Sequence, residues 1–131
     1  MSAYTKTNLK SDVEDAAKKF GMAPNLEFHV GREPLDAEQT AVSYLRLAPE
    51  FRMPFGHKHK QQEEVYVLVR GGAKLKLDDE VIELTPWDAV RIDKDTVRNL
   101  EAGPDGAELI LVGAPNTGAN DAEMLQGWWT D

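Results

Sequence analysis

A series of short strand patterns, separated by turn residues, runs through most of the chain and limits its fold class. Residues 64–70 (EVYVLVR) form the strongest of these patterns, because β-branched and aromatic side chains fill it. Alternating or continuously apolar runs also mark residues 26–30, 41–47, 74–77, 81–84, 88–92 and 107–113. Strand patterns that recur about every 8–12 residues, with turn signals between them, predict an all-β sandwich or barrel.

Two parts of the chain depart from the strand pattern. Residues 9–21 predict a short helix, in which Ser11 and Glu14 form a capping box. We expect this helix to pack on the barrel. Near the C-terminus, Asp121 can cap one helical turn that runs through Leu125.

The composition limits the class of protein. The chain has 131 residues, of which 41% are hydrophobic and 29% charged, and this fits a single globular domain. It contains no cysteine, so disulfides and cysteine-based sites are excluded. Because no stretch approaches about 18 apolar residues and no apolar run of the signal-peptide type is present, we expect a cytoplasmic protein with no membrane partner. A net charge of −8 disfavours nucleic acid as a partner, since phosphate binding needs clustered Lys and Arg.

Two of the three histidines lie close together in the sequence, and an acidic residue follows them. On a strand, His57 and His59 point to the same side, where both can reach one metal ion. The odd offset of Glu64 would place it on the opposite face of an unbroken strand, but the polar residues 60–63 can form a turn that lets it face the histidines. The alternative is that the two histidines are polar residues of a barrel wall, hydrogen-bonded to Glu64. The third histidine, His29, falls on the polar side of its strand and is expected to be exposed.

The stretch His57-Lys-His59, four residues, Glu64, six residues and Gly71 resembles the first motif of the cupin family. The resemblance covers about residues 40–114 and is to the small single-domain cupins usually labelled conserved-barrel proteins, a name that implies no one activity. It implies a double-stranded β-helix, or jelly-roll, barrel. We therefore expect a single cupin domain over residues 1–131, made of an N-terminal helical arm (1–24), a barrel (25–114) and a C-terminal tail (115–131).

The second motif of the cupin family is recognisable but altered. Leu84 and Pro86 align with it, whereas Trp87 stands at the position of the usual glycine and Arg98 at that of a metal-ligating histidine. Family metal sites typically use three histidines and one glutamate. A guanidinium is always charged and has no lone pair to donate, so Arg98 cannot ligate a metal. It could swing away from a metal, pair with Glu64 in a metal-free pocket, or bind an anionic group of a ligand.

The residues present at this site predict a two-histidine, one-carboxylate metal site with open positions. Such a set, here His57, His59 and Glu64, is used by non-haem Fe(II) oxygenases and also suits Mn, Ni or Zn. Because metal ligands must be deprotonated, occupancy should fall below about pH 6. The candidate ligand-binding residues around the metal are Arg98, Tyr66, Tyr44 and Arg46.

The predicted function is small-molecule binding at this site, with a divalent metal as cofactor. One alternative is a metal-dependent enzyme of the dioxygenase or isomerase type that acts on a small polar organic substrate, with Arg98 orienting a carboxylate. Another is a sensing module that signals through its dimer. A homodimer is expected because Val65, Val67 and Val69 share the outer face of their strand, and leaving them in water would forfeit several kcal/mol.

Overall fold

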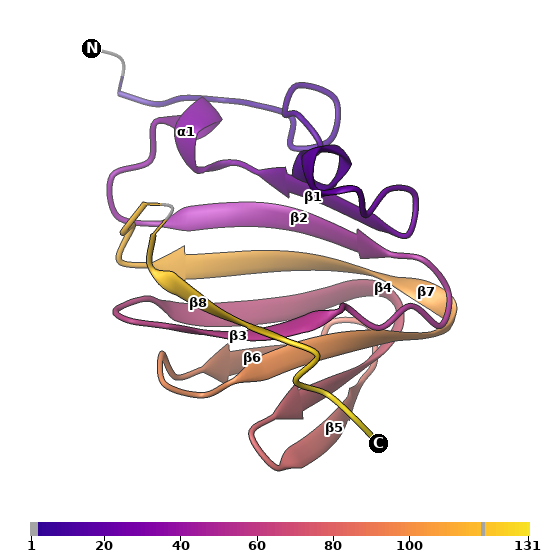
Figure 1. Cartoon of the computed structure of the whole chain (residues 1–131). Coiled ribbons are helices and arrows are strands. Elements are labelled where there is room, and N and C mark those ends of the chain that lie inside the picture. Colours follow the sequence, from indigo (N-terminus) through magenta and orange to yellow (C-terminus); the bar gives the residue numbers. More distant parts are fainter. Residues whose placement is uncertain (1–2, 119) are drawn as a thin grey trace.

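The computed structural model describes residues 3–118 and 120–131 and consists mainly of antiparallel strands (Figure 1). The all-β prediction is therefore confirmed. The strands are β1 (Leu26–Val30), β2 (Ala41–Leu47), β3 (Phe55–His59), β4 (Glu63–Leu77), β5 (Glu80–Leu84), β6 (Ala89–Ile92), β7 (Arg98–Ala114) and β8 (Ala122–Gln126). Two short helices, the 3-10 helix η1 (Ala16–Phe20) and α1 (Arg32–Leu35), lie before β2. Among the described residues, no helix is long and apolar enough to cross a membrane.

Two long strands, β4 and β7, curl the sheet into a barrel. The strand order is β1-β2-β7-β3-β8, and β4 pairs with β5, β6 and β7. The register between β4 and β7 shifts between Leu68 and Arg70 and again between Gly71 and Ala73. Such bulges bend a strand and increase its twist. Gly71 has φ 83°, and a Cβ at this position would collide with the backbone oxygen of Gly106, so the bend requires glycine.

The inner face of the barrel is lined by buried leucines. Leu45 of β2 and Leu68 of β4 both lie opposite Leu109 of β7, and none of the three is more than 2% exposed. Leu75 and Leu100 continue this face beyond the bend. Burying each leucine stabilises the fold by about 1.5–3 kcal/mol. Because alternate residues of a strand share a face, the polar residues at the start of β4 lie at one end of this apolar core.

The N-terminal helix is much shorter than predicted. The helix η1 has five residues, and the side chain of its N-cap, Asp15, accepts a hydrogen bond from the backbone N–H of Ala17. The predicted capping box of Ser11 and Glu14 does not start this helix, because η1 begins after both residues.

The C-terminal tail contains a strand where a helical turn was predicted from Asp121 through Leu125. The strand β8 pairs with β3 from Phe55 opposite Gln126 to His59 opposite Ala122. Figure 1 shows the yellow tail alongside β3. The tail therefore borders the strand that carries His57 and His59.

The remaining histidine, His29, is buried and not exposed as predicted. Its Nδ1–H donates a hydrogen bond to the backbone oxygen of Val13 (2.7 Å), and its Nε2 lies 2.8 Å from Oε1 of Glu27. Nearby, Nζ of Lys10 lies 5.1 Å from the centroid of the Tyr44 ring. The alternation in β1 correctly separates His29 from the core face, but the N-terminal segment covers the side on which it lies.

Candidate metal centre

The structure brings His57, His59 and Glu64 together. The two histidines project from the same side of β3, with ring centroids 5.0 Å apart and ring planes at 80°. Oε1 of Glu64, at the start of β4, lies 3.4 Å from Nε2 of His57 and 3.0 Å from Nε2 of His59. One ligand atom from each of the three residues lies within 4.8 Å of the others. The odd sequence offset of Glu64 is accommodated because the chain turns between β3 and β4.

The turn between β3 and β4 is held by Asp121, which the sequence analysis did not connect to this site. The Asp121 carboxylate accepts hydrogen bonds from the backbone N–H groups of Gln61 and Gln62, each at 3.0 Å. It also lies 3.0 Å from Nδ1 of His59, and its backbone oxygen accepts a hydrogen bond from Lys60 N. No short motif could have revealed these contacts, because Asp121 is 62 residues from His59 along the chain.

Burial and hydrogen bonding set the charge of the cluster. Burial alone would raise the pKa of Glu64, but hydrogen bonds and positive charge from His57 and His59 outweigh it and lower the pKa to about 2. Burial lowers the pKa of His57 below its ordinary value of 6.5, although the Glu64 carboxylate partly opposes this shift. The cluster therefore favours an ionised carboxylate and a neutral imidazole, which are the forms that ligate metals.

Arg98 lies beside the cluster and is completely buried. Its two terminal nitrogens donate to backbone oxygens, one to His57 (3.5 Å) and one to Asp93 (3.3 Å). Its Nε lies 3.8 Å from Oε1 of Glu64 and has no hydrogen-bond partner within the described part of the chain. Arg98 therefore lies at ion-pair distance from Glu64, beside the cluster. Tyr66 also reaches the cluster, with its hydroxyl 3.5 Å from the same Glu64 oxygen.

The structure does not bring Tyr44 and Arg46 to this cluster, contrary to the prediction that they join Tyr66. In β2 these two residues alternate with Leu45, which faces the core, so they lie on the outer face of the sheet. The Tyr44 hydroxyl donates to Glu108 (2.6 Å), and Nε of Arg46 donates to Glu27 (2.8 Å). The sequence pattern correctly paired the two side chains but assigned them to the wrong face.

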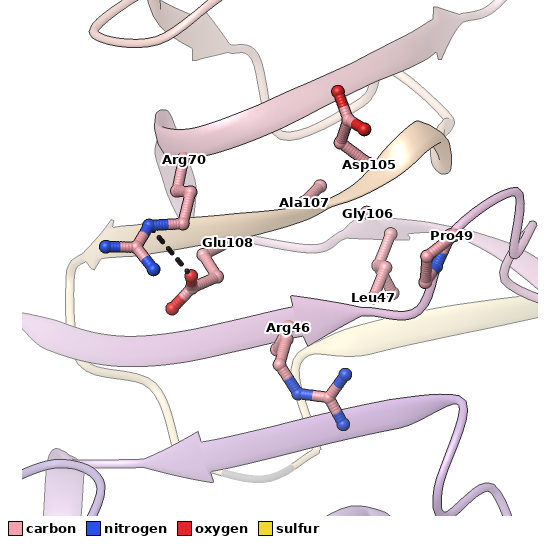
Figure 2. A pocket seen from close by; sticks show the side chains of 8 residues that line it. All are labelled: Arg46, Leu47, Pro49, Arg70, Asp105, Gly106, Ala107 and Glu108. Carbon is pink, nitrogen blue, oxygen red and sulfur yellow. Dashed lines mark ion pairs between the residues drawn. The ribbon is translucent and has the colours of Figure 1, made fainter.

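A cavity of about 110 Å³ lies on the outer side of the barrel and includes Arg46 (Figure 2). Figure 2 shows Arg70 paired with Glu108 at this cavity, at a distance of 3.5 Å. The first β-bulge places Arg70 here, although uninterrupted alternation along β4 predicts the inner face. A larger groove, of about 680 Å³, lies between the N-terminal segment and β1 and is lined by His29 and Arg46 among others. Neither cavity is lined by a residue of the histidine cluster.

The donor set fits a divalent metal ion. Two atoms that bind one ion at about 2.1 Å are roughly 3.0–3.4 Å apart at octahedral or tetrahedral angles. The distances from Glu64 Oε1 to the two Nε2 atoms, 3.0 and 3.4 Å, are in this range. Arg98 cannot supply a fourth ligand, so a bound ion would keep positions for water or a ligand.

A curled antiparallel barrel whose β3 and β4 carry His57, His59 and Glu64 agrees with the resemblance to the first cupin motif. No protein-family model matches this sequence, and no curated protein matches it either. Several solved structures, in contrast, are similar to this chain. A cupin protein from Bacteroides fragilis is 26% identical, with 92% of this chain and 91% of that chain covered and a TM-score of 0.71.

Two further similar structures are enzymes by name. Streptomyces Pac13, solved with uridine and described as a nucleoside dehydratase, is 14% identical, with 92% of this chain and 90% of that chain covered and a TM-score of 0.74. Oxalate decarboxylase from Bacillus subtilis is 19% identical, with 95% of this chain and 34% of that chain covered and a TM-score of 0.78. This chain has the cupin-superfamily fold, and the predicted jelly-roll barrel is confirmed.

The altered second motif has a conformational consequence at Trp87. This residue has φ 76°, a left-handed conformation that favours glycine, and it is 74% exposed. The glycine that the family usually has here therefore suits the backbone better than tryptophan. The turn is held by Asp88, whose carboxylate accepts hydrogen bonds from the backbone N–H (2.8 Å) and the hydroxyl (3.2 Å) of Thr85.

Proposed function

We propose that this protein binds a small molecule at a divalent metal ion held by His57, His59 and Glu64. The observation that carries the proposal is the convergence of two histidine Nε2 atoms on one buried carboxylate oxygen, at the spacing of ligands of a single ion. Fe, Mn, Ni and Zn all accept such a donor set. With three protein ligands, the ion would offer at least one position to a ligand.

The residues around the proposed ion favour a ligand with a carboxylate or another oxyanion. Arg98 presents a buried Nε–H that has no hydrogen-bond partner among the described residues, and such a donor costs about 1–3 kcal/mol when unsatisfied. The Tyr66 hydroxyl donates to the same Glu64 oxygen at 3.5 Å and could instead donate to a ligand beside it. An oxyanion that reaches the ion next to Glu64 would accept hydrogen bonds from these donors.

A second candidate function is metal-dependent catalysis of the dioxygenase or isomerase type on a small polar organic substrate. It is favoured by the two-histidine, one-carboxylate set, which leaves room for substrate beside the ion. A bound metal would supply Lewis-acid or redox chemistry there. Arg98 would then hold the substrate carboxylate, and Tyr66 would limit the space beside Glu64.

The metal proposal is tested on protein purified without added metal, by elemental analysis and then by titration of the chelator-stripped protein. We expect about one divalent ion per chain, and loss of this ion in His57→Ala and Glu64→Gln. His29→Ala, which removes the histidine outside the cluster, is the matched control and should retain the metal. Equal metal content in all four proteins, or no binding by the stripped wild-type chain, would refute the proposal. Stoichiometric iron or manganese would favour the catalytic alternative.

We also propose that the protein is a homodimer that buries the outer face of β4. Val65, Val67 and Val69 are only partly buried, and Val112 and Ile110 of β7 lie beside the first two. The N-terminal segment packs on β1, and the tail pairs with β3, so both occupy other parts of the barrel. Light scattering of the wild type should give twice 14.6 kDa, and Val67→Glu should give 14.6 kDa. A wild-type mass of 14.6 kDa at micromolar concentration would exclude the dimer.

A further inference from the structure

His59 lies between two carboxylates. Its Nδ1 is 3.0 Å from Oδ2 of Asp121, and its Nε2 is 3.0 Å from Oε1 of Glu64. A neutral imidazole carries one N–H, so only one of its nitrogens can donate while the other presents a lone pair. The carboxylate that accepts the N–H therefore decides which nitrogen is available to a metal ion.

The surroundings of Asp121 make it the acceptor. Its side chain is 5% exposed, and every hydrogen-bond contact of its carboxylate within the described residues is with a nitrogen: Gln61 N, Gln62 N and His59 Nδ1. Two of these are backbone N–H groups that can only donate, which requires an acceptor at both carboxylate oxygens. With its Nδ1–H donating to Asp121, His59 turns Nε2 toward Glu64, so that a cation bound at Nε2 would lie beside that carboxylate.

Asp121 is held in place by the segment that follows it. The following strand, β8, pairs with β3, so that Ala122 lies opposite His59. Beyond β8, Trp128 packs against Gly56, where an added Cβ would lie 2.7 Å from the Trp128 ring. The ring of Trp129 lies 4.3 Å from the guanidinium carbon of Arg52. These contacts hold the tail against the barrel, and Figure 1 shows β8 running along β3.

We propose that Asp121 is a positioning residue of the metal site, which keeps the His59 proton on Nδ1 and directs Nε2 to the metal. The C-terminal segment, residues 121–131, is then a component of the site and not only a cover of the barrel. The inference rests on the proposed metal binding, and it adds a requirement that the three ligands alone do not contain.

The first measurement is the protonation of His59 in the full-length, metal-free protein, by nitrogen NMR of the imidazole ring. In the wild type we expect Nδ1 to be protonated, because it donates to Asp121. In Asp121→Ala the remaining acceptor is Glu64, so the proton should move to Nε2. Glu123→Gln is the matched control, because it removes a β8 carboxylate whose only ion pair among the described residues is with the exposed Lys58, and it should leave His59 unchanged.

The second measurement is zinc affinity, by competition with a chromophoric chelator. Loss of a partner that orients a metal-ligating histidine typically weakens binding by about 10–100-fold, and we expect this for Asp121→Ala. Asp121→Asn keeps one oxygen that can accept from Nδ1, so it should recover part of the affinity and guards against a folding defect in the alanine variant. Glu123→Gln should bind zinc as the wild type does.

The outcomes separate this inference from the metal proposal. If folded Asp121→Ala and Asp121→Asn bind zinc within about twofold of the wild type, or if the His59 proton remains on Nδ1 without Asp121, the positioning role is refuted while the metal site stands. If the wild type itself binds no zinc, the metal proposal fails, and with it the role of Asp121 in that site.

Discussion

Replacing Arg98 should raise the affinity of the site for divalent metal by at least tenfold. An ion bound at about 2.1 Å from Glu64 Oε1 would be at most roughly 6 Å from Arg98 Nε, which lies 3.8 Å from the same oxygen. The divalent ion and the singly charged guanidinium repel at this distance by about 1.4 kcal/mol in water and by about 5.5 kcal/mol at an effective dielectric constant of 20. The smaller figure already corresponds to a tenfold change in affinity.

Two variants separate the charge of Arg98 from the missing ligand. Arg98→Gln removes the repulsion, and Arg98→His also supplies the imidazole that the cupin motif usually has at this position. We expect zinc affinity, measured by chelator competition, to rise in the order wild type, Arg98→Gln, Arg98→His. Arg91→Gln, which changes an exposed arginine on β6, is the control for net charge. Wild-type affinity in both Arg98 variants, with the barrel intact by circular dichroism, would show that the guanidinium does not face the ion.

Two further predictions concern stability. Trp87→Gly should stabilise the protein by about 1 kcal/mol in denaturant titrations, because φ 76° strains any residue with a Cβ. Trp87→Ala keeps the Cβ and should show no such gain. An equal gain in both variants would refute the backbone explanation. Acid should destabilise the metal-free protein in two ranges, because both shifted groups bind fewer protons when folded. His57, whose pKa is lowered by burial, stabilises the fold above pH 6.5, and this contribution is lost as the pH falls below 6.5. Glu64, whose pKa falls from 4.5 to about 2, loses its contribution between these values, and Glu64→Gln should abolish the second loss but not the first in thermal unfolding.

The sequence predicted individual strands well because their signals are local. The strand over residues 41–47 has the predicted bounds, and the hairpin over 74–84 turns at Asp78, whose φ is 51°. The long strand β4 was predicted as two separate strands, and only residues 107–113 of β7 were predicted as a strand. Glycine is typical of strand ends, yet at Gly71 the chain bends and β4 continues to pair with β7. Glycine signals a break in regular geometry but does not distinguish a bend from a termination.

The site was predictable where its residues are neighbours in sequence and, for Arg98, where the second cupin motif aligns. The spacing of His57, His59 and Glu64 contains the whole geometry of the cluster once a turn is assumed. Asp121 and the face of Tyr44 depend instead on pairing between distant strands, β8 with β3 and β2 with β7. A period of two assigns side chains to two faces but does not say which face is inside.

The charge balance of the site leads to a last prediction, that metal and oxyanion bind cooperatively. With a divalent ion present, the positive charges of the ion and of Arg98 exceed the negative charge of Glu64. His57 adds no charge, because its lowered pKa favours the neutral form. An anionic ligand beside the ion would offset this excess, so each should strengthen the binding of the other. We expect acetate to raise zinc affinity by about fivefold or more, after correction for acetate–zinc complexes in solution. Arg98→Gln should lose most of this coupling, whereas Arg91→Gln should keep it. If acetate has the same effect on wild type and Arg98→Gln, the coupling does not arise from the buried guanidinium, and Arg98 has no part in recognising the ligand.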